Sequence, residues 1–297
     1  MKIVNRSKTC LIISCAIMVV ALIMTITGHG INLGIDFEGG LSMEYNLGAT
    51  AVKGDLEGIL SDMGVKTYTV TYQGNNENEA IIRIKDVAED DIQNIQAQFE
   101  AKVLEKYPEA KSVGDVNYVG PVAGATLVRN AVISVLLAAA LMLVYIAIRF
   151  DLNSGLSAVF GLLYDVLIML SFMVILRGLI QMNSSFIAAA LTIVGYSINN
   201  TIVIFDRIRE NAKKYPTLPR EEVTNLSIKE SLGRTINTTL TTLITIVALC
   251  VLGVASIREF ALPIIVGILS GVYSANMING YIWAFLEERR KAAKAKA

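Results

Sequence analysis

The chain has 297 residues, of which 54% are hydrophobic and only 18% are charged, and its mean hydropathy is +0.54. A soluble globular domain carries about 25% charged residues, so this composition argues against an ordinary soluble enzyme. Intrinsic disorder would need few hydrophobic and many charged residues, which is the opposite of this composition. The 26 basic and 26 acidic side chains cancel, and no basic domain or RNA-binding motif indicates a nucleic-acid partner.

Few side chains are of the kinds that bind metals or attack substrates. The three cysteines (Cys10, Cys15 and Cys250) lie in apolar runs, and His29 is the only histidine. A disulfide framework, a histidine-based metal site and a histidine-dependent catalytic triad are therefore not expected. The sequence also lacks a phosphate-binding loop of the Gly-x-x-x-x-Gly-Lys-Ser/Thr type. We predict a protein that is not an enzyme and holds no cofactor or metal.

Six apolar runs are long enough to cross a bilayer, which takes about 20 mostly apolar residues. We expect membrane spans at residues 9–28, 126–148, 153–176, 180–205, 234–255 and 260–286. The first run follows a basic segment, as a signal peptide does, but it is longer than the usual apolar region of about 7–15 residues. An uncleaved signal anchor is the expectation.

The distribution of Lys and Arg beside the spans predicts the orientation. With the N-terminus inside, the cytoplasmic flanks hold 16 of these residues, and the two short outer loops hold only Arg177 and Arg258. We therefore expect a multi-pass protein of the cell membrane with both termini in the cytoplasm. The parts outside the spans are then a cytoplasmic N-terminus at 1–8, an extracytoplasmic domain at 29–125, a cytoplasmic loop at 206–233 and a cytoplasmic tail at 287–297.

The polar segment after the first span has the patterns of a small mixed domain. We expect strands at 41–47, 65–72, 80–84 and 113–119, helices at 50–63 and 87–107, and a turn at 74–76. The order β-α-β-β-α-β is typical of a ferredoxin-like split βαβ sandwich. The predicted fold class is an α-helical polytopic membrane protein with six transmembrane helices and one small α+β ferredoxin-like extracytoplasmic domain between the first two.

This segment is acidic, with 16 acidic and 7 basic side chains between Asp36 and Asp115. A solvated face that keeps the domain soluble is the simpler interpretation. A docking face for an unfolded basic polypeptide is the alternative.

Asp165 lies in the middle of the third predicted span. A carboxylate at membrane depth is costly, so it is expected to be protonated or paired. The functional interpretation is a proton site or the partner of a cation. The structural interpretation is a hydrogen bond that locks two helices together.

Further polar residues lie on the fourth and fifth spans. Asn199 and Asn200 point about 100° apart on a helix, so one can face a neighbouring helix and the other a polar cavity. Arg234 and the threonines that follow it lie close to one helix face. This stripe suits a hydrated path through the bundle, or else the threonines bond to carbonyls of their own helix.

Four segments resemble motifs of the SecD/SecF family of protein-export membrane proteins. Residues 34–40 read GIDFEGG and resemble its first signature, and Val119-Gly120-Pro121 resembles its second. Residues 195–211 and 231–235 resemble the fourth-span motif and the start of the fifth span on the SecF side of the family. The motif residues carried over are Gly34, Asp36, Phe37, Gly39, Gly40, Gly195, Tyr196, Ser197 and Arg207.

The resemblance implies an accessory subunit of the Sec translocase, related to the resistance-nodulation-division transporters. It implies that SecD forms the other half of a transporter-like pair, and that a proton or sodium motive force promotes preprotein export. The implied partners are SecD, the SecYEG translocon, the translocating preprotein and membrane lipid, with YajC and YidC as further candidates.

Two positions depart from the family pattern. The family usually has Asp at the position of Asn200, and that Asp is taken as a proton relay with the arginine 34 positions later, here Arg234. The carboxylate that takes up the proton is then expected on SecD. The alternatives are that Asp165 takes this role, or that this half of the pair is mainly structural. Tyr164 stands where the family often has His, which leaves the coupling ion open. The ion-coupling candidates are Arg234, Asp165, Asn200, Asn199 and Asp206.

Two other functions compete with ion-driven export. A non-transporting scaffold would hold SecD and the translocon together. Half of an efflux-type transporter is the third interpretation, although such transporters usually carry both halves in one chain, and 297 residues are too few for that.

Overall fold

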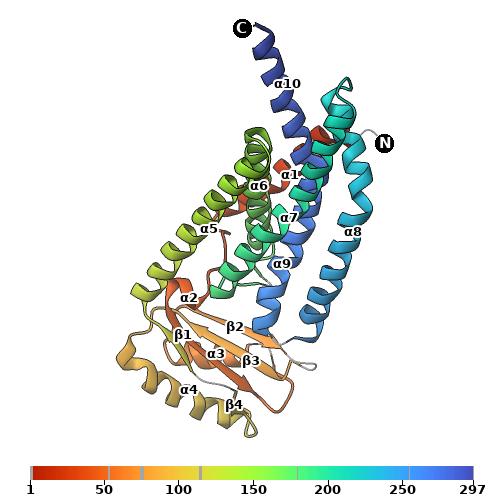
Figure 1. Cartoon of the computed structure of the whole chain (residues 1–297). Coiled ribbons are helices and arrows are strands. Elements are labelled where there is room, and N and C mark those ends of the chain that lie inside the picture. The colour runs from red at the N-terminus through yellow and green to blue at the C-terminus, as the bar shows by residue number, and fades with distance from the viewer. Residues whose placement is uncertain are drawn as a thin grey trace. The chain divides into compact units, whose positions relative to one another are not determined.

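The computed structural model describes residues 3–52, 54–73, 77–113, 116–178, 180–253 and 255–296. Two compact units are present. Leu33–Ala131 form a sheet unit, and Met1–Asn32 together with Val132–Ala297 form a helical unit. Figure 1 shows the strands gathered in the first unit and the long helices in the second.

The sheet unit contains one antiparallel sheet. Its elements are β1 (Gly40–Asn46), α3 (Asp55–Asp62), β2 (Tyr68–Gln73), β3 (Glu79–Ile84), α4 (Ile92–Lys106), β4 (Lys111–Ser112) and β5 (Asn117–Val119). The strand order is β2-β3-β1-β4, and β5 also pairs with β1. Because β1 lies between β3 and the last strands, the order is that of a ferredoxin-like sandwich, and the predicted fold class is confirmed.

Alternation along the strands forms the core of this unit. Leu41, Met43 and Tyr45 of β1 are buried beside Ile82 of β3, and Phe99 of α4 packs against them. The ring centroids of Tyr45 and Phe99 are 5.6 Å apart. Residues of α3 complete the same core, so both helices cover one face of the sheet.

The helix expected at 50–63 begins only at Asp55, and two further details of this unit differ from the expectation. The helix expected from residue 87 begins as a 3-10 turn, Glu89–Asp91, and α4 starts at Ile92. The strand expected at 113–119 is replaced by β4 and β5, because Tyr45 and Asn46 pair with β4 while residues 40–42 pair with β5. The turn expected at 74–76 lies outside the described residues.

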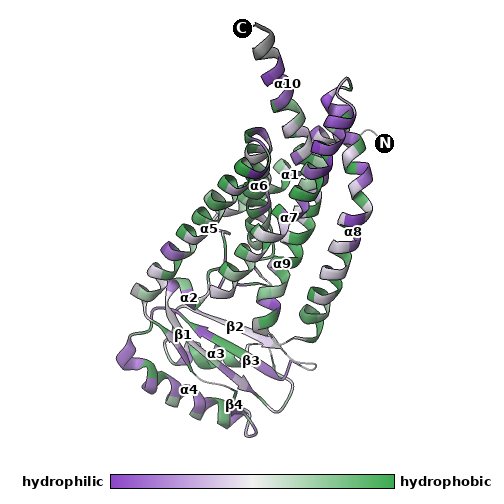
Figure 2. Ribbon diagram, in the orientation of Figure 1, coloured by the Kyte–Doolittle hydropathy of each residue, from purple (hydrophilic) through white to green (hydrophobic). Residues whose placement is uncertain are grey.

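The helical unit is built from long helices. They are α1 (Ile3–Ile26), α5 (Pro121–Arg149), α6 (Leu152–Ile175), α7 (Ser184–Lys214), α8 (Arg220–Leu252), α9 (Ala255–Ser274) and α10 (Gly280–Lys296). Residues 121–131 of α5 belong to the sheet unit and the rest of that helix to the helical unit. A π-helical turn, Ala275–Asn279, joins α9 to α10 in one long helix. Among the described residues, six helical segments are long and apolar enough to cross a membrane. Figure 2 shows hydrophobic residues along most of their length and hydrophilic ones towards the C-terminal ends of α7 and α10 and the N-terminal end of α8.

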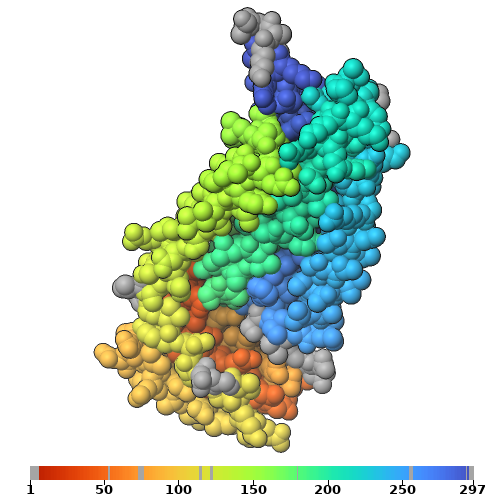
Figure 3. Space-filling model, in the orientation of Figure 1, coloured from red at the N-terminus to blue at the C-terminus, as the bar shows by residue number. Residues whose placement is uncertain are grey.

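The six segments divide into inner and outer helices. About half or more of the most apolar window is buried in α6 (56%), in α7 (50%) and in the α9–α10 segment (61%). The corresponding values are 11% for α1, 6% for α5 and 11% for α8. The space-filling view in Figure 3 shows α8 exposed along one side of this unit. The outer helices therefore have wide apolar faces that no part of the described chain covers.

The loop expected at 206–233 is mostly helical. Helix α7 continues to Lys214 and α8 begins at Arg220, so only residues 215–219 connect them. The connector contains Pro216 and Pro219, which cannot continue α7 because proline lacks an amide hydrogen. At its other end, α7 begins at Ser184 rather than at 180, after Asn183 in an extended conformation.

Candidate functional site

Asp165 lies inside the helical unit with 1% of its surface exposed. Three serine hydroxyls donate hydrogen bonds to its carboxylate: Ser197 of α7, and Ser270 and Ser274 of α9. The donor–acceptor distance is 2.6 Å for Ser270 to Oδ1 and 2.9 Å for Ser274 to Oδ2, and Ser197 also donates to Oδ2. One carboxylate thus links all three inner helices.

Small residues allow this close approach. A Cβ atom on Gly271 would lie 3.3 Å from the Cα atom of Ser197, so α7 and α9 are nearly in backbone contact there. A Cβ atom on Gly161 of α6 would overlap the side-chain amide of Asn279. Such small-residue contacts are typical of packing between membrane helices.

The π-helical turn extends the polar interior towards the start of α6. Ser157 Oγ donates to the backbone carbonyl of Asn279 at 2.6 Å, and Asn279 Nδ2 donates to Thr201 Oγ1 of α7 at 2.9 Å. A π-helical turn inserts one residue into a helix and occurs frequently at functional sites. Here it turns an amide side chain and a carbonyl towards the two neighbouring inner helices.

Three buried amide atoms in this interior have no hydrogen-bond partner among the described residues. They are Asn200 Nδ2, Asn276 Oδ1 and Asn279 Oδ1. Buried polar groups are nearly always paired, so an interior that leaves three unpaired can accept further polar partners such as water or a proton carrier. We call the residues Ser157, Asp165, Ser197, Asn200, Thr201, Ser270, Ser274, Asn276 and Asn279 the polar seam.

A hydrogen bond between two hydroxyl groups joins α1 to α6. The hydroxyl oxygens of Ser14 and Tyr164 are 2.5 Å apart, and both side chains are buried. Tyr164 precedes Asp165, so the helix directs these two adjacent side chains to different neighbours. The tyrosine therefore contacts α1 and takes no part in holding the carboxylate.

The threonine stripe of α8 has a different character. Thr241 and Thr242 donate to the carbonyl of Thr238, at 2.8 and 3.0 Å, and Thr245 donates to that of Thr241 at 3.1 Å. Of the two sequence interpretations, bonding within the helix is therefore the one that the structure shows. Thr239 differs from these three threonines, because its hydroxyl oxygen accepts a hydrogen bond from the Tyr196 hydroxyl of α7 at 3.1 Å.

Arg234 is exposed on α8 and makes no ion pair or side-chain hydrogen bond with the described part of the chain. Asn199 and Asp206 are exposed on α7, and so they lie apart from the buried Asn200. Of the five ion-coupling candidates, the structure thus places Asp165 and Asn200 in the interior and the other three on the surface of this chain.

Arg207 joins the ends of α7 and α8. It pairs with Glu230 (Nε to Oε2, 2.7 Å) and with Glu210 (Nη1 to Oε2, 2.5 Å). Asn211 Nδ2 donates to the same Glu230 at 2.7 Å. These bonds lie beyond the polar seam and fix the paired helix ends.

The first motif, Gly34–Gly40, forms a tight bend before β1. Residues Ile35–Glu38 make one helical turn, α2, and Phe37 is buried. Gly39 and Gly40 have φ angles of 83° and 135°, which side chains other than glycine rarely adopt. A Cβ atom on Gly40 would also overlap the carbonyl of Ile84, so this glycine allows β1 to reach β3.

The second motif meets the first. A Cβ atom on Gly124, just after Val119-Gly120-Pro121, would lie 2.6 Å from the carbonyl oxygen of Phe37. The start of α5 therefore rests on the backbone of α2. Both motifs are explained by close backbone packing within the sheet unit.

Sequence reasoning identified Asp165 and Ser197 separately but did not connect them, and it did not name Ser270. The available signal was the spacing of Gly267, Ser270, Gly271 and Ser274, which places four small residues on one face of α9. Among the described residues, no cluster of three or more His, Cys, Asp and Glu side chains could hold a metal ion.

Comparison with known proteins gives two family matches. Residues 99–289 match the family described as protein export membrane protein SecD/SecF, C-terminal, and residues 25–51 match the SecD/SecF GG motif. The second range contains Gly39 and Gly40, the glycines of the tight bend.

Curated relatives and solved structures agree with these matches. The protein translocase subunit SecF of Rhodothermus marinus is 37% identical, and the alignment covers 99% of this chain and 96% of that protein. The SecDF protein of Bacillus subtilis is 34% identical over 94% of this chain but only 37% of its own length. The crystal structure of SecDF from Thermus thermophilus, described as a translocon-associated membrane protein, superposes with a TM-score of 0.81 at 32% identity.

The alignment to that structure covers 97% of this chain and 38% of the longer one, so this chain spans about two fifths of the SecDF proteins. It spans nearly the whole of the separate SecF subunits. A multi-pass membrane protein with this fold and these relatives has a role in protein export. The chain belongs to the SecD/SecF family of protein export membrane proteins, on its SecF side.

Proposed function

We propose that this chain works with SecD as an accessory subunit of the Sec translocase and uses a proton or sodium motive force to promote preprotein export. In this proposal both termini lie in the cytoplasm and residues 29–125 lie outside the membrane, on the side that receives the preprotein. SecYEG is the translocon it serves, and YajC and YidC are further candidate partners.

The observation that carries the proposal is the carboxylate of Asp165, which accepts hydrogen bonds from two other inner helices. A charge at membrane depth costs several kcal/mol, and such residues mark ion pathways in membrane proteins. A protonated carboxyl group donates one hydrogen bond and accepts fewer than an ionised carboxylate. A change in its charge would therefore alter the bonding among α6, α7 and α9 and shift the population of two bundle arrangements.

Arg234 supplies the link to SecD in this proposal. It is exposed and unpaired within the described chain, on a helix whose apolar face is largely uncovered. A guanidinium in that position would pair with an ionisable carboxylate of SecD, which replaces the aspartate that Asn200 does not provide. Protonation of that carboxylate would weaken the pair.

A scaffold function is the second candidate, and one observation favours it. Three hydroxyls already satisfy Asp165, so the carboxylate could serve only to hold the inner helices together. In that case Asp165→Asn and Arg234→Gln would leave export unchanged once the complex is assembled, whereas deletion of residues 29–125 would abolish it.

The test measures preprotein export into membrane vesicles that contain SecD and this chain, with and without an imposed ion gradient. We expect Arg234→Leu to remove the gradient-dependent part of export while the chain still assembles with SecD. Lys229→Leu is the matched control, because Lys229 is also exposed on α8. Gradient-dependent export that survives Arg234→Leu unchanged would refute the coupling role and favour the scaffold.

A further inference from the structure

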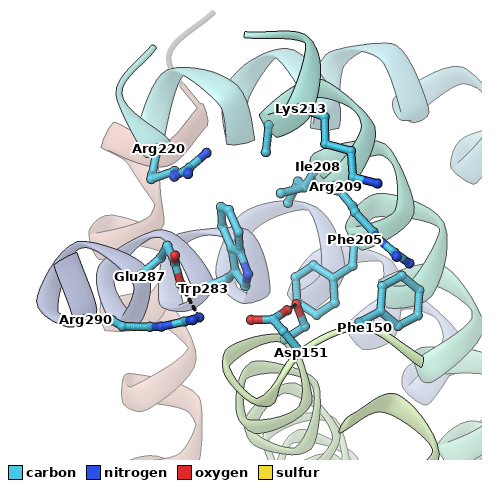
Figure 4. Close-up of a pocket in the computed structure, with 12 residues that line it drawn as sticks. Phe150, Asp151, Phe205, Ile208, Arg209, Lys213, Arg220, Trp283, Glu287 and Arg290 are labelled. Atoms are coloured by element: carbon cyan, nitrogen blue, oxygen red, sulfur yellow. Dashed lines mark hydrogen bonds and ion pairs between the residues drawn. The ribbon is translucent and has the colours of Figure 1, made fainter. Parts of the chain in front are cut away.

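A pocket of about 310 Å³ opens at the end of the helical unit where α6 begins and α7 ends. The aromatic residues Phe150, Phe205 and Trp283 line it (Figure 4). Four cationic side chains, Arg209, Lys213, Arg220 and Arg290, also line it. The pocket is of the size that small ligands occupy, and it lies apart from the polar seam.

The two carboxylates of the pocket already have partners. Asp151 accepts a hydrogen bond from Ser154. Glu287 accepts from Asn153 Nδ2 at 2.8 Å and from Arg290 Nη1 at 3.4 Å. Four cations and two carboxylates leave the lining with an excess of positive charge.

Arg220 is the residue that most requires a further partner. Its Nε and Nη1 atoms are buried and have no hydrogen-bond partner among the described residues. Figure 4 shows its side chain extending from the start of α8 towards the other residues that line the pocket. Two buried N–H groups without partners on a partly exposed guanidinium are costly, and the planar group matches phosphate and carboxylate oxygens.

We infer that this pocket binds the phosphate group of a ligand that carries a net negative charge. The phosphate could come from a lipid headgroup or from a soluble anion, and the location at the end of membrane helices favours an anionic phospholipid. Basic pockets between transmembrane helices bind such headgroups, and aromatic side chains favour the interface where the headgroup meets the acyl chains. A phosphodiester beside Arg220 and Lys213 would link the ends of α7 and α8 to α6 and α10.

The leaflet follows from the orientation proposed above and would be the cytoplasmic one. Binding by the purified chain does not depend on that orientation or on ion coupling. A failed binding test would therefore leave the export proposal intact, and a failed export test would leave the pocket intact.

Trp283 provides a direct signal, because it is the only tryptophan in the chain and it lines the pocket. The full chain in a non-ionic detergent is titrated with short-chain phosphatidylglycerol while tryptophan fluorescence is recorded. We expect a saturable change in the wild type, at least tenfold weaker binding in Arg220→Gln, and several-fold weaker binding in Lys213→Gln. Lys229→Gln removes an exposed cation of α8 outside the pocket and should bind as the wild type does.

Two further probes identify the source of the phosphate. Phosphatidylcholine of the same chain length should bind much more weakly, because its headgroup carries no net negative charge. If inorganic phosphate saturates the signal as tightly as phosphatidylglycerol, the phosphate site stands and its ligand is a soluble anion.

The inference is overturned if phosphatidylglycerol and phosphatidylcholine give the same titration, or if no probe changes the fluorescence. It is also overturned if Arg220→Gln binds as the wild type does. Lys213 is exposed, so Lys213→Gln keeps the test valid should Arg220→Gln fail to fold.

Discussion

The interior of the sheet unit is apolar, whereas the interior of the helical unit contains the polar seam. Leu41, Met43, Ile82 and Phe99 fill the first and are removed from water on folding, which supplies the stabilisation of an ordinary domain. Lipid is as apolar as leucine, so burial of apolar surface gives membrane helices little reason to associate. Hydrogen bonds and close packing around Asp165 hold the inner helices together instead.

The comparison predicts its largest effect in the sheet unit. Phe99→Ala removes a fully buried ring and should cost about 3–5 kcal/mol of the unit's stability. Amide hydrogen exchange of β1 and β3 in the full chain measures this loss, and the inner helices should keep their protection. Leu104→Ala on the exposed side of α4 is the control and should change protection by no more than about 0.5 kcal/mol. Equal effects of the two variants would contradict the assignment of Phe99 to the core.

The next effect concerns the polar seam. Ser274→Ala removes one donor from a buried carboxylate and should lower the free energy of unfolding in detergent by about 1–3 kcal/mol. Thr245→Ala should stay within about 0.5 kcal/mol, because Thr245 is exposed and bonds only to its own helix. A loss in Thr245→Ala as large as that in Ser274→Ala would show that the seam is no more stabilising than the stripe of α8.

One buried polar atom in the sheet unit gives an effect of opposite sign. The Tyr45 hydroxyl is buried without a hydrogen-bond partner among the described residues, and burial, with a smaller effect of Glu100, raises the pKa of Tyr45 to about 12. Tyr45→Phe should therefore stabilise the unit by about 1 kcal/mol, since no hydrogen bond is lost. Hydrogen exchange of β1 is again the measurement, and destabilisation would mean that the hydroxyl has a partner.

The smallest effect is a pH dependence in the same unit. A hydrogen bond from Lys106 (Nζ to Oδ1, 2.8 Å), together with a weaker one from Tyr107, lowers the pKa of Asp55 below its usual value of 3.8. Because the pKa of Asp55 is lower in the folded state, its ionised carboxylate stabilises the unit at pH values above 3.8. This stabilisation is lost as the pH falls through the lowered pKa. Both side chains are partly exposed, so Asp55→Asn should cost only a few tenths of a kcal/mol near neutral pH. The difference in stability between Asp55→Asn and the wild type should vanish in acid. A difference that grows as the pH falls would contradict the stabilising role of the ionised carboxylate.

Much of the fold could be predicted from the sequence, because apolar length and strand alternation depend on residues close together in the chain. The helical continuation through residues 206–214 and 220–233 could not, since a loss of hydrophobicity ends a span without ending a helix. The real break lies where Pro216 and Pro219 interrupt the chain.

The site could be predicted only in part. A carboxylate within an apolar run identifies Asp165, but its three donors are 32, 105 and 109 residues away in sequence. The π-helical turn that brings Asn279 to Thr201 depends on packing between helices and has no local signature. The same limit applies to the partner proposed for Arg234, because a partner on another chain would leave no trace in this sequence.

The most direct test of the account is the gradient dependence of export in vesicles that contain SecD and the Asp165→Asn chain. An asparagine keeps the size of the side chain but cannot change its charge. Its amide nitrogen donates where a carboxylate oxygen accepts, so at least one of the three serine hydroxyls must turn to accept. Glu222→Gln on the exposed start of α8 is the matched control. The account predicts that Asp165→Asn assembles normally and that an imposed gradient no longer stimulates its export, while Glu222→Gln responds as the wild type does. Full stimulation of export in Asp165→Asn would contradict the claim that the polar seam couples ion movement to protein export.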